Sequence, residues 1–384
     1  MISITEKSNC CGCGACAQKC PRQCIVMKED AEGFLYPKVN QEECVECGLC
    51  DSVCPMKSPQ GKRQPLLVIA AKNTDLKVRE ASSSGGVFHL LAQGFVERGG
   101  VVFGAEFDED WSVRHNRADN VSGIHKFMGS KYSQSRIDTA YIDAEKELKA
   151  GREVLFSGTP CQIAGLKNYL VKDYSNLTTV AVVCHGVPSP AVWRSYMETF
   201  CNSSSRKEKE SWPTIQNISF RDKRRGWKRY GMAITTPTES FFEYHRDNLF
   251  MKGFLSNIYL RPSCYSCIFK AGMSKCDIIL GDFWGINTIM PDFDDDKGVS
   301  LVLAYSQKGK EMIQSLPLDY REAKYEDALK CNPCIETSVS PHSERSWFYK
   351  KFPQLGVSAT QKALNRGRPS LLKRMASRIW NCLS

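Results

Sequence analysis

The sequence predicts a small, cysteine-dense α+β module followed by a larger α/β body with a mixed, largely parallel sheet. Ten of the 19 cysteines lie between residues 10 and 54. A polar, proline-bounded linker follows at 58–65, and beyond it short apolar runs alternate with helical patterns. A chain of 384 residues is long enough for two or three domains. We place the module at 1–60, the two parts of the body at 66–200 and 201–350, and a basic amphipathic tail at 351–384.

The module contains two cysteine runs of the same spacing. Each reads C-x2-C-x2-C-x3-C and is followed by proline. In ferredoxin-type domains with this spacing, three neighbouring thiolates bind one 4Fe-4S cluster and the fourth cysteine reaches the other cluster. We therefore predict a ferredoxin-like module with two 4Fe-4S clusters. Cluster one is assigned to Cys10, Cys13, Cys16 and Cys54, and cluster two to Cys44, Cys47, Cys50 and Cys20.

Two other uses of these cysteines fit the sequence less well. Zinc sites favour two CxxC pairs that are well separated. A secreted disulfide framework disagrees with the odd cysteine count, the long chain and an N-terminal MISITEK that lacks a signal-peptide core. We therefore expect metal binding in a reducing cytoplasm. Cys11 and Cys24 lie outside the repeated spacing and are expected to be packed thiols, while residues 27–40 fit a short hairpin.

Net charge and hydropathy limit the partners that this chain is expected to bind. The formal net charge is +10, but thiolate-bound clusters would offset part of it and no nucleic-acid-binding motif accompanies it. We therefore expect no nucleic-acid partner. No run of 18 apolar residues predicts a membrane span. Residues 366–384 combine basic residues with apolar residues at helical spacing. A surface helix or docking element explains this tail, and peripheral contact with an anionic membrane is the alternative.

The sequence of the body predicts strands that alternate with helices. Residues 66–71 and 101–108 have buried-strand patterns, and residues 153–161 predict a strand and a turn that lead into the helical stretch QIAGLKNYL. Residues 178–186 repeat this plan, with a helix from about Ala191. A loop or insertion is expected at 201–213, and antiparallel strands are expected around 217–236.

A third set of cysteines lies in the body. Cys161 and Cys184 end predicted strands, which is where α/β proteins place their sites. Together with Cys264 and Cys267 they supply enough thiolates for one more 4Fe-4S cluster. The alternative is two core cysteines plus an isolated CxxC turn or redox dithiol. Weaker ligand candidates are Cys276 and the CxxC pair Cys331 and Cys334.

Taken together, the body motifs resemble the coenzyme F-420 hydrogenase/dehydrogenase beta-subunit family, almost end to end from the module to about residue 350. The stretches that carry the resemblance are Ser82–Phe88, Gly129–Ser135, Leu155–Gln162, Cys184–Gly186, Phe220–Lys223 with Gly226 and Trp227, Arg261–Cys267, and Asp277–Gly285. The resemblance implies a flavoprotein that binds FAD beside an iron–sulfur cluster. It also favours the third cluster over ligand roles for Cys276, Cys331 and Cys334.

Several residues in these stretches have side chains suited to a flavin. Residues 82–86 precede an apolar helical stretch whose first amides suit a pyrophosphate, although a plain helix cap explains them equally. Basic side chains could neutralise flavin phosphates, and a tyrosine could stack on the ring. The candidate cofactor-binding residues are Ser83, Ser84, Gly85, Gly86, Lys131, Tyr132, Thr159, Gln162, Arg221, Lys223 and Asp282. The catalytic residues are unknown from sequence, and His185 is the one candidate proton donor.

We expect an iron–sulfur flavoprotein oxidoreductase. In this hypothesis, electrons move from a ferredoxin-like donor or another oxidoreductase subunit through 4Fe-4S clusters to FAD. They then pass to a small-molecule substrate, which is a coenzyme F-420-like compound or another oxidised metabolite. The alternative is an electron-relay subunit of a larger redox complex with no substrate site of its own. A third hypothesis, in which the clusters only stabilise the fold, is disfavoured because two adjacent redox centres exceed what scaffolding needs.

Overall fold

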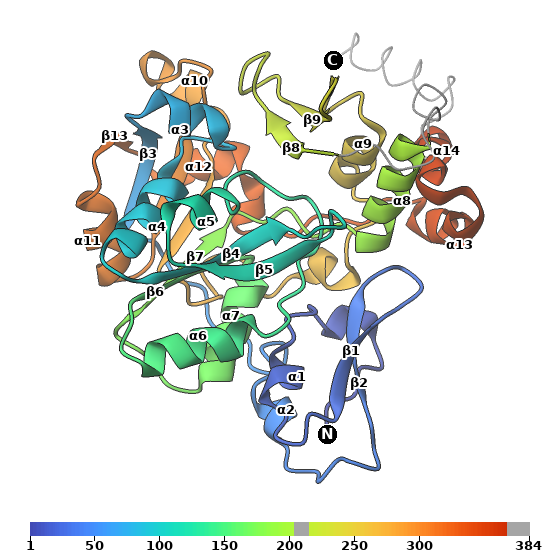
Figure 1. The fold of residues 1–384 in the computed structure, drawn as a ribbon. Coiled ribbons are helices and arrows are strands. Elements are labelled where there is room, and N and C mark those ends of the chain that lie inside the picture. The colour runs from blue at the N-terminus through green and yellow to red at the C-terminus, as the bar shows by residue number, and fades with distance from the viewer. Residues whose placement is uncertain (203–214, 367–384) are drawn as a thin grey trace, which may run out of the picture.

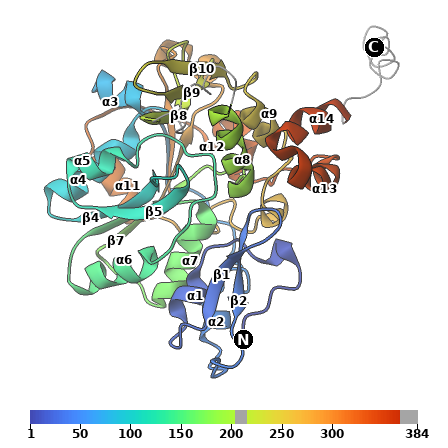
Figure 2. The same cartoon turned by 45° about the vertical axis from the view of Figure 1, so that its right-hand side comes forward.

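The computed structural model describes residues 1–202 and 215–366, and the N-terminal module lies against one side of the body (Figures 1 and 2). The insertion expected at 201–213 and the amphipathic tail expected at 366–384 fall almost wholly outside the described residues. The first part of the predicted tail, through Arg366, is helical and packs onto the body. Within the described ranges, no helix combines the length and apolar character that crossing a membrane requires.

The module consists of one antiparallel hairpin and two short helices. Gly14 and Gly48 cap the helices with φ of +73° and +74°, a left-handed conformation that glycine adopts without steric cost. The Asp30 carboxylate accepts the amide hydrogens of Glu32 and Phe34 and thereby closes the hairpin. The elements are η1 Lys7–Asn9, α1 Ala15–Lys19, β1 Ile25–Glu29, β2 Leu35–Val39 and α2 Leu49–Ser52. The hairpin overlaps the segment 27–40 where the sequence predicts one and begins two residues earlier, at Ile25.

The body is built on an eight-stranded sheet of order β13-β3-β12-β11-β7-β6-β4-β5. The four strands β11, β7, β6 and β4 pair in parallel, and antiparallel partners flank them on both sides. Because β3 pairs antiparallel with β12, it runs in the same direction as these four. The prediction of a mixed, largely parallel sheet is therefore confirmed. The strands are β3 Leu67–Asn73, β4 Val101–Phe107, β5 Val113–Ala118, β6 Val154–Gly158, β7 Leu177–Val182, β11 Ile278–Asp282, β12 Ser300–Ala304 and β13 Leu318–Glu322.

Alternate side chains of the strands enter two different hydrophobic layers. On β6, Leu155 packs into one layer, whereas Val154 and Phe156 pack into the other. The first layer is covered by α4 and α11; the second is covered by α6 and α7 and includes Cys11 and Cys13 of the module. The module and the body therefore share a core. The helices are α3 Leu76–Ala81, α4 Val87–Glu97, α5 Val121–His125, α6 Ala140–Lys149, α7 Pro160–Leu170, α10 Ile286–Ile289, α11 Gln307–Gln314 and α12 Tyr325–Cys331.

A third core lies beside the sheet, where an antiparallel three-stranded sheet of order β10-β9-β8 packs with helices. Trp193, Phe220 and Phe250 are among its fully buried aromatic residues. Its elements are α8 Pro190–Cys201, β8 Asn217–Asp222, β9 Gly231–Thr235, β10 Ser240–Tyr244, α9 Leu249–Leu255, α13 Arg345–Leu355 and α14 Ala359–Arg366. Short 3-10 turns complete the fold: η3 Pro262–Ser266, η4 Pro291–Phe293, η5 Pro333–Ile335 and η6 Gly356–Ser358.

Candidate redox centres and a basic cradle

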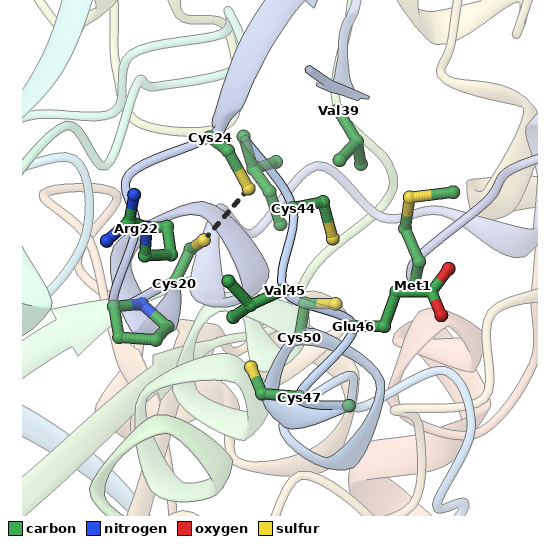
Figure 3. A pocket seen from close by; sticks show the side chains of 13 residues that line it. Met1, Cys20, Arg22, Cys24, Val39, Cys44, Val45, Glu46, Cys47 and Cys50 are labelled. Carbon is green, nitrogen blue, oxygen red and sulfur yellow. Dashed lines mark hydrogen bonds between the residues drawn. The ribbon is translucent and has the colours of Figure 1, made fainter. Parts of the chain in front are cut away.

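One pocket of the module is lined by the thiols assigned to cluster two. Figure 3 shows the sulfur atoms of Cys20, Cys44, Cys47 and Cys50 around a common space. The fourth cysteine of the first run therefore lies with the second run. The backbone N–H of Ile2 donates to Cys50 Sγ at 3.2 Å, a contact that stabilises negative charge on a cluster ligand.

A fifth thiol, Cys24, also lines this pocket, with its Sγ 3.4 Å from that of Cys20 (Figure 3). Cys24 is buried, as expected of a packed thiol. Its position beside the cluster-two thiols was not predicted, because it falls outside the repeated spacing.

The cysteines assigned to cluster one lie on the side of the module that faces the body. Burial, together with the nearby charges of Cys10 and Cys54, raises the pKa of the Cys16 thiol to about 12. Burial also raises the pKa of Cys54, and Cys10 adds to the rise. Such crowded, desolvated thiols cannot all ionise without a compensating cation, so this set fits iron binding.

Cys13, the remaining member of this set, packs against α7. A Cβ atom on Gly165 of α7 would lie 2.9 Å from Cys13 Cβ and 3.0 Å from its Sγ. Only glycine leaves room for this approach. A glycine in the middle of a predicted helix was the sequence signal of close packing at this position.

The four body cysteines, Cys161, Cys184, Cys264 and Cys267, converge from three separate segments. Cys161 opens α7 directly after β6, Cys184 follows β7, and the other two belong to or follow η3. Burial raises the pKa of Cys184, and the nearby Cys264, Cys161 and Cys267 thiols reinforce the rise against the opposing charge of Lys270. Burial also raises the pKa of Cys264 to about 12 and that of Cys267 to about 11. The chemistry of this donor set fits a third cluster.

Cys11 connects the module to this set. It is buried, and its thiol contacts those of Cys13 and Cys161. The contact with Cys13, together with burial, raises the pKa of Cys11, whereas the contact with Cys161 lowers it. The body places the other extra cysteines differently. Cys276 is fully buried beside Ser274, and Cys331 is exposed. Cys334 Sγ lies 3.6 Å from His185 Nδ1.

His185 follows Cys184 and is held between two partners. Its Nε2 atom lies 2.6 Å from Asn257 Oδ1, on the opposite side of the ring from Cys334. Burial lowers the pKa of the imidazole, and the charge of Lys270 lowers it further. The ring therefore lies beside the body cysteines in its neutral form.

Most of the candidate flavin residues gather around residues 83–84, and we call Ser83, Ser84, Lys131, Arg221 and Lys223 the basic cradle. Ser130 donates to Ser83 Oγ through its N–H at 2.6 Å and its hydroxyl at 2.9 Å, which ties the loop carrying Lys131 to this site. Lys223 Nζ donates to the carbonyl of Ser84 at 3.2 Å. The cradle is therefore held together by contacts between three separate segments.

Neither cradle lysine forms an ion pair with a carboxylate in the part of the chain that the structure describes. Lys131 Nζ donates to the carbonyls of Met128 and Gly129, at 2.9 and 3.2 Å. Burial lowers the pKa of Lys131 to about 7. Burial and the charges of Arg221 and Arg79 lower the pKa of Lys223 to about 8. An anion placed here would favour the charged form of both lysines.

Arg221 is paired, in contrast to the lysines. It is buried and donates to both oxygens of Asp282, at 2.7 and 3.0 Å, while Trp227 Nε1 donates to one of them at 2.8 Å. Arg221 Nη1 also donates to the hydroxyl of Tyr132 at 3.3 Å, and its guanidinium lies 4.0 Å from the centre of the Tyr230 ring. Its Nε is buried and has no hydrogen-bond partner among the described residues.

The two candidate glycines serve packing rather than an open phosphate loop. A Cβ atom on Gly85 would lie 2.3 Å from the carbonyl oxygen of Ala71, and the Gly85 N–H donates to Ser300 Oγ at 2.9 Å. Gly86 has φ of +82° and begins α4. The Ser84 hydroxyl donates to the carbonyl of Val299. The loop before α4 therefore uses several of its hydrogen-bond donors in contacts within the fold.

Thr159 and Gln162 form a capping box at the start of α7 rather than joining the cradle directly. Gln162 Nε2 donates to Ser135 Oγ at 2.9 Å, so it ties the loop that carries Lys131 and Tyr132 to the first turn of α7. That turn also carries Cys161. The capping box thereby links the basic cradle to the body cysteines.

Two family models match the chain. Residues 9–58 match the model described as a 4Fe-4S dicluster domain, and residues 151–326 match the model for the C terminus of the coenzyme F-420 hydrogenase/dehydrogenase beta subunit. A comparison with curated proteins returns no match.

Among solved structures, the chain is similar to a chain in a structure described as a xenon derivatization of the F-420-reducing NiFe hydrogenase complex from Methanosarcina barkeri. The two are 17% identical, the likeness covers 80% of this chain and 93% of the other, and the TM-score is 0.45. At that TM-score the likeness supports no further conclusion.

Proposed function

Because residues 151–326 belong to the coenzyme F-420 hydrogenase/dehydrogenase beta-subunit family and residues 9–58 form a 4Fe-4S dicluster domain, we propose that this iron–sulfur electron-transfer protein is an FAD-binding oxidoreductase. It would take electrons from a ferredoxin-like donor or another oxidoreductase subunit, in a reducing cytoplasm. It would deliver them to a coenzyme F-420-like deazaflavin or another oxidised metabolite. When bound, the clusters carry single electrons and FAD links one-electron to two-electron chemistry.

The observation that carries the proposal is a series of buried and half-buried cysteines that runs from the module into the body. Cys13, in the set assigned to cluster one, contacts Cys11, and Cys11 contacts Cys161. Cys161 in turn faces the other three body cysteines, of which Cys264 and Cys267 respond to its charge. Electron transfer needs redox centres that lie close together, and Cys11 links the two sets of thiols through direct contacts.

In this proposal the body cysteines hold a third 4Fe-4S cluster. Several neighbours would stabilise negative charge on it. Val187 N–H donates to Cys264 Sγ at 3.4 Å, and the Thr159 hydroxyl lies 3.1 Å from Cys161 Sγ. Such hydrogen bonds to ligand sulfurs are a common means by which proteins adjust cluster potentials.

The basic cradle would bind the anionic part of FAD. Lys131 and Lys223 lack carboxylate partners among the described residues, and Gln162 ties the loop with Lys131 to the helix turn that carries Cys161. A flavin bound by the cradle would therefore lie near the body cysteines. The Arg221–Asp282 pair would position the cradle rather than neutralise the phosphates, because its charge is already compensated.

A second candidate is an electron-relay subunit without flavin. The internal hydrogen bonds of Ser84 and Gly85 favour it, because they leave the loop before α4 fewer free donors for a pyrophosphate. In this case the neighbouring oxidoreductase subunit would hold the substrate site.

Cofactor content separates the two candidates. The full chain would be purified without oxygen, and iron, sulfide and acid-released flavin would be measured. About twelve irons and one FAD per chain are expected for the oxidoreductase. About eight irons and no flavin would overturn the third cluster and the flavin together and leave the relay.

A further inference from the structure

Arg261 is a buried arginine that reaches from the body into the module. It immediately precedes η3, and its backbone is fixed there: its N–H donates to the carbonyl of Val187 at 3.0 Å, and its carbonyl accepts the N–H of Cys264 at 2.9 Å. Its exposed fraction is 0%. The residue therefore stands directly between η3, which carries a body cysteine, and the cluster-one side of the module.

The guanidinium of Arg261 makes specific contacts with the module. Nε donates to the carbonyl of Cys10 at 2.8 Å, and Nη2 donates to the carbonyl of Leu35 at 2.9 Å. Nη2 also lies 3.5 Å from Cys10 Sγ, a thiol of the cluster-one set. The guanidinium carbon lies 4.3 Å from the centre of the Tyr36 ring. These contacts fix the positive charge beside the cluster-one thiols.

Gly12 allows this approach. A Cβ atom there would lie 2.7 Å from Arg261 Nη1 and 2.8 Å from Gln134 Nε2, and Gly12 has φ of +70°. The backbone of the first cysteine run therefore lies in close contact with the Arg261 side chain. Gln134 Oε1 accepts from Nη1 at 3.0 Å, and its Nε2 donates to the carbonyl of Cys11.

Arg261 differs from the other buried arginines in having no carboxylate partner within residues 1–202 and 215–366. Arg79 pairs with Asp295 and Arg221 with Asp282, and the half-buried Arg345 pairs with Glu32. Burying an unpaired guanidinium is costly, so such a charge is retained where a negative group compensates it. The group that would carry negative charge beside Arg261 is a cysteine, since Cys10 Sγ lies 3.5 Å from Nη2.

We propose that Arg261 is the electrostatic bridge between cluster one and the body cysteines, and that its uncompensated charge raises the reduction potential of cluster one. Reduction adds a negative charge to a cluster, and a fixed positive charge in a low-dielectric site stabilises the reduced form. Electrons in the module would therefore favour the cluster that faces the body. The bridge to the body cysteines rests on the proposed function, whereas the effect on cluster one needs only the dicluster domain.

Three variants of the full chain test this role. Arg261→Gln removes the charge. Gln134→Glu keeps the arginine and gives it a carboxylate partner of nearly the same shape. Arg345→Gln is the matched control, because it breaks the half-buried pair with Glu32, which also joins the body to the module, without touching a cysteine. Each would be purified anaerobically, checked for iron and sulfide, and titrated potentiometrically with electron paramagnetic resonance as the readout.

The expected result is a fall in the midpoint potential of one cluster in both Arg261→Gln and Gln134→Glu, with a second cluster unshifted. Arg345→Gln should leave the midpoints at their wild-type values. If Arg261→Gln loses iron, the near-isosteric Gln134→Glu variant decides. Unchanged midpoints in iron-replete Gln134→Glu protein, or an equal shift of all clusters, would overturn the proposal. Eight irons in the wild type would remove the third cluster but not the expected shift.

Discussion

The module and the body assemble their cysteines in different structural settings. In the module, the thiols around the cluster-two pocket sit in a core whose buried residues are only Ile2, Cys24, Ile25 and Cys50. In the body, Cys161, Cys184, Cys264 and Cys267 lie at the ends of elements that two large hydrophobic layers already hold in place. A chain segment with so small a core needs metal to fold, whereas a large sheet does not. If both sets bind clusters as proposed, the cysteines in the module serve structure and redox chemistry together, and those in the body serve redox chemistry alone.

Complete removal of iron should give the largest effect and should separate the two regions. We expect residues 1–60 to become sensitive to protease and to lose hydrogen-exchange protection, because the residual apolar core cannot hold the hairpin and the helices. The eight-stranded sheet should keep its protection. Limited proteolysis with mass spectrometry measures both regions in one sample. Equal loss of protection in the module and in the body would contradict the expectation that only the module needs metal to stay folded.

Loss of a single body cysteine should remove one cluster and little else. Cys264→Ala is expected to lose about four of about twelve irons, while the thermal unfolding of the body is nearly unchanged. The control is Cys276→Ala, which also removes a buried thiol from the body but lies outside the converging set. Iron analysis and thermal denaturation are measured on both variants. Full iron retention in Cys264→Ala would remove this residue from the ligand set.

The same difference explains what sequence could and could not predict. The module's thiols are close in sequence, so their spacing alone indicated two cluster sets and the crossing of the fourth cysteine of each. Four strands of the large sheet, β3, β4, β6 and β7, were predicted because each is an apolar run, and Cys161 and Cys184 could be placed at strand ends for that reason. The other four strands of that sheet, β5, β11, β12 and β13, were not predicted. The neighbourhood of Cys11 could not be predicted, because it depends on how the module docks onto α7.

Contacts between residues far apart in the sequence could not be predicted either. Arg261 belongs to the motif that also contains a CxxC pair of the body. Its side chain nevertheless contacts Cys10 and Leu35 of the module. Gly85 seemed suited to a phosphate, and the structure instead packs it against Ala71 and Ser300 of the sheet. Both differences arise because the type of a residue indicates its local conformation and chemistry. It does not indicate which distant residue it contacts in the folded chain.

Within the body, the Arg221–Asp282 pair should matter to stability more than an exposed pair does. Asp282→Ala leaves a buried guanidinium without its partner, and we expect the free energy of unfolding to fall by about 3 kcal/mol. The control is Glu153→Ala, which breaks the exposed pair with Arg98 and should cost less than about 1 kcal/mol. Urea denaturation measures both variants. If the free energy of unfolding falls no more in Asp282→Ala than in Glu153→Ala, the buried pair with Arg221 stabilises the fold no more than an exposed pair does.

The smallest expected effect concerns the two cradle lysines, and pH reveals it. An anion binds best while both lysines are charged. Affinity should therefore be greatest below pH 7 and should fall as pH rises through the lowered pKa values of about 7 for Lys131 and about 8 for Lys223. Fluorescence titration of flavin-free protein with FAD between pH 6 and 9 measures this dependence.

Lys131→Met tests which lysine causes the fall. We expect about tenfold weaker FAD binding at pH 6, since one charged hydrogen bond is lost, and a profile that no longer changes near pH 7. The control is Lys126→Met, which removes an exposed lysine nearby. If Lys131→Met binds FAD as tightly as the control with the same pH profile, the cradle does not hold the flavin. The body cysteines would then lie beside a basic site that serves another anion.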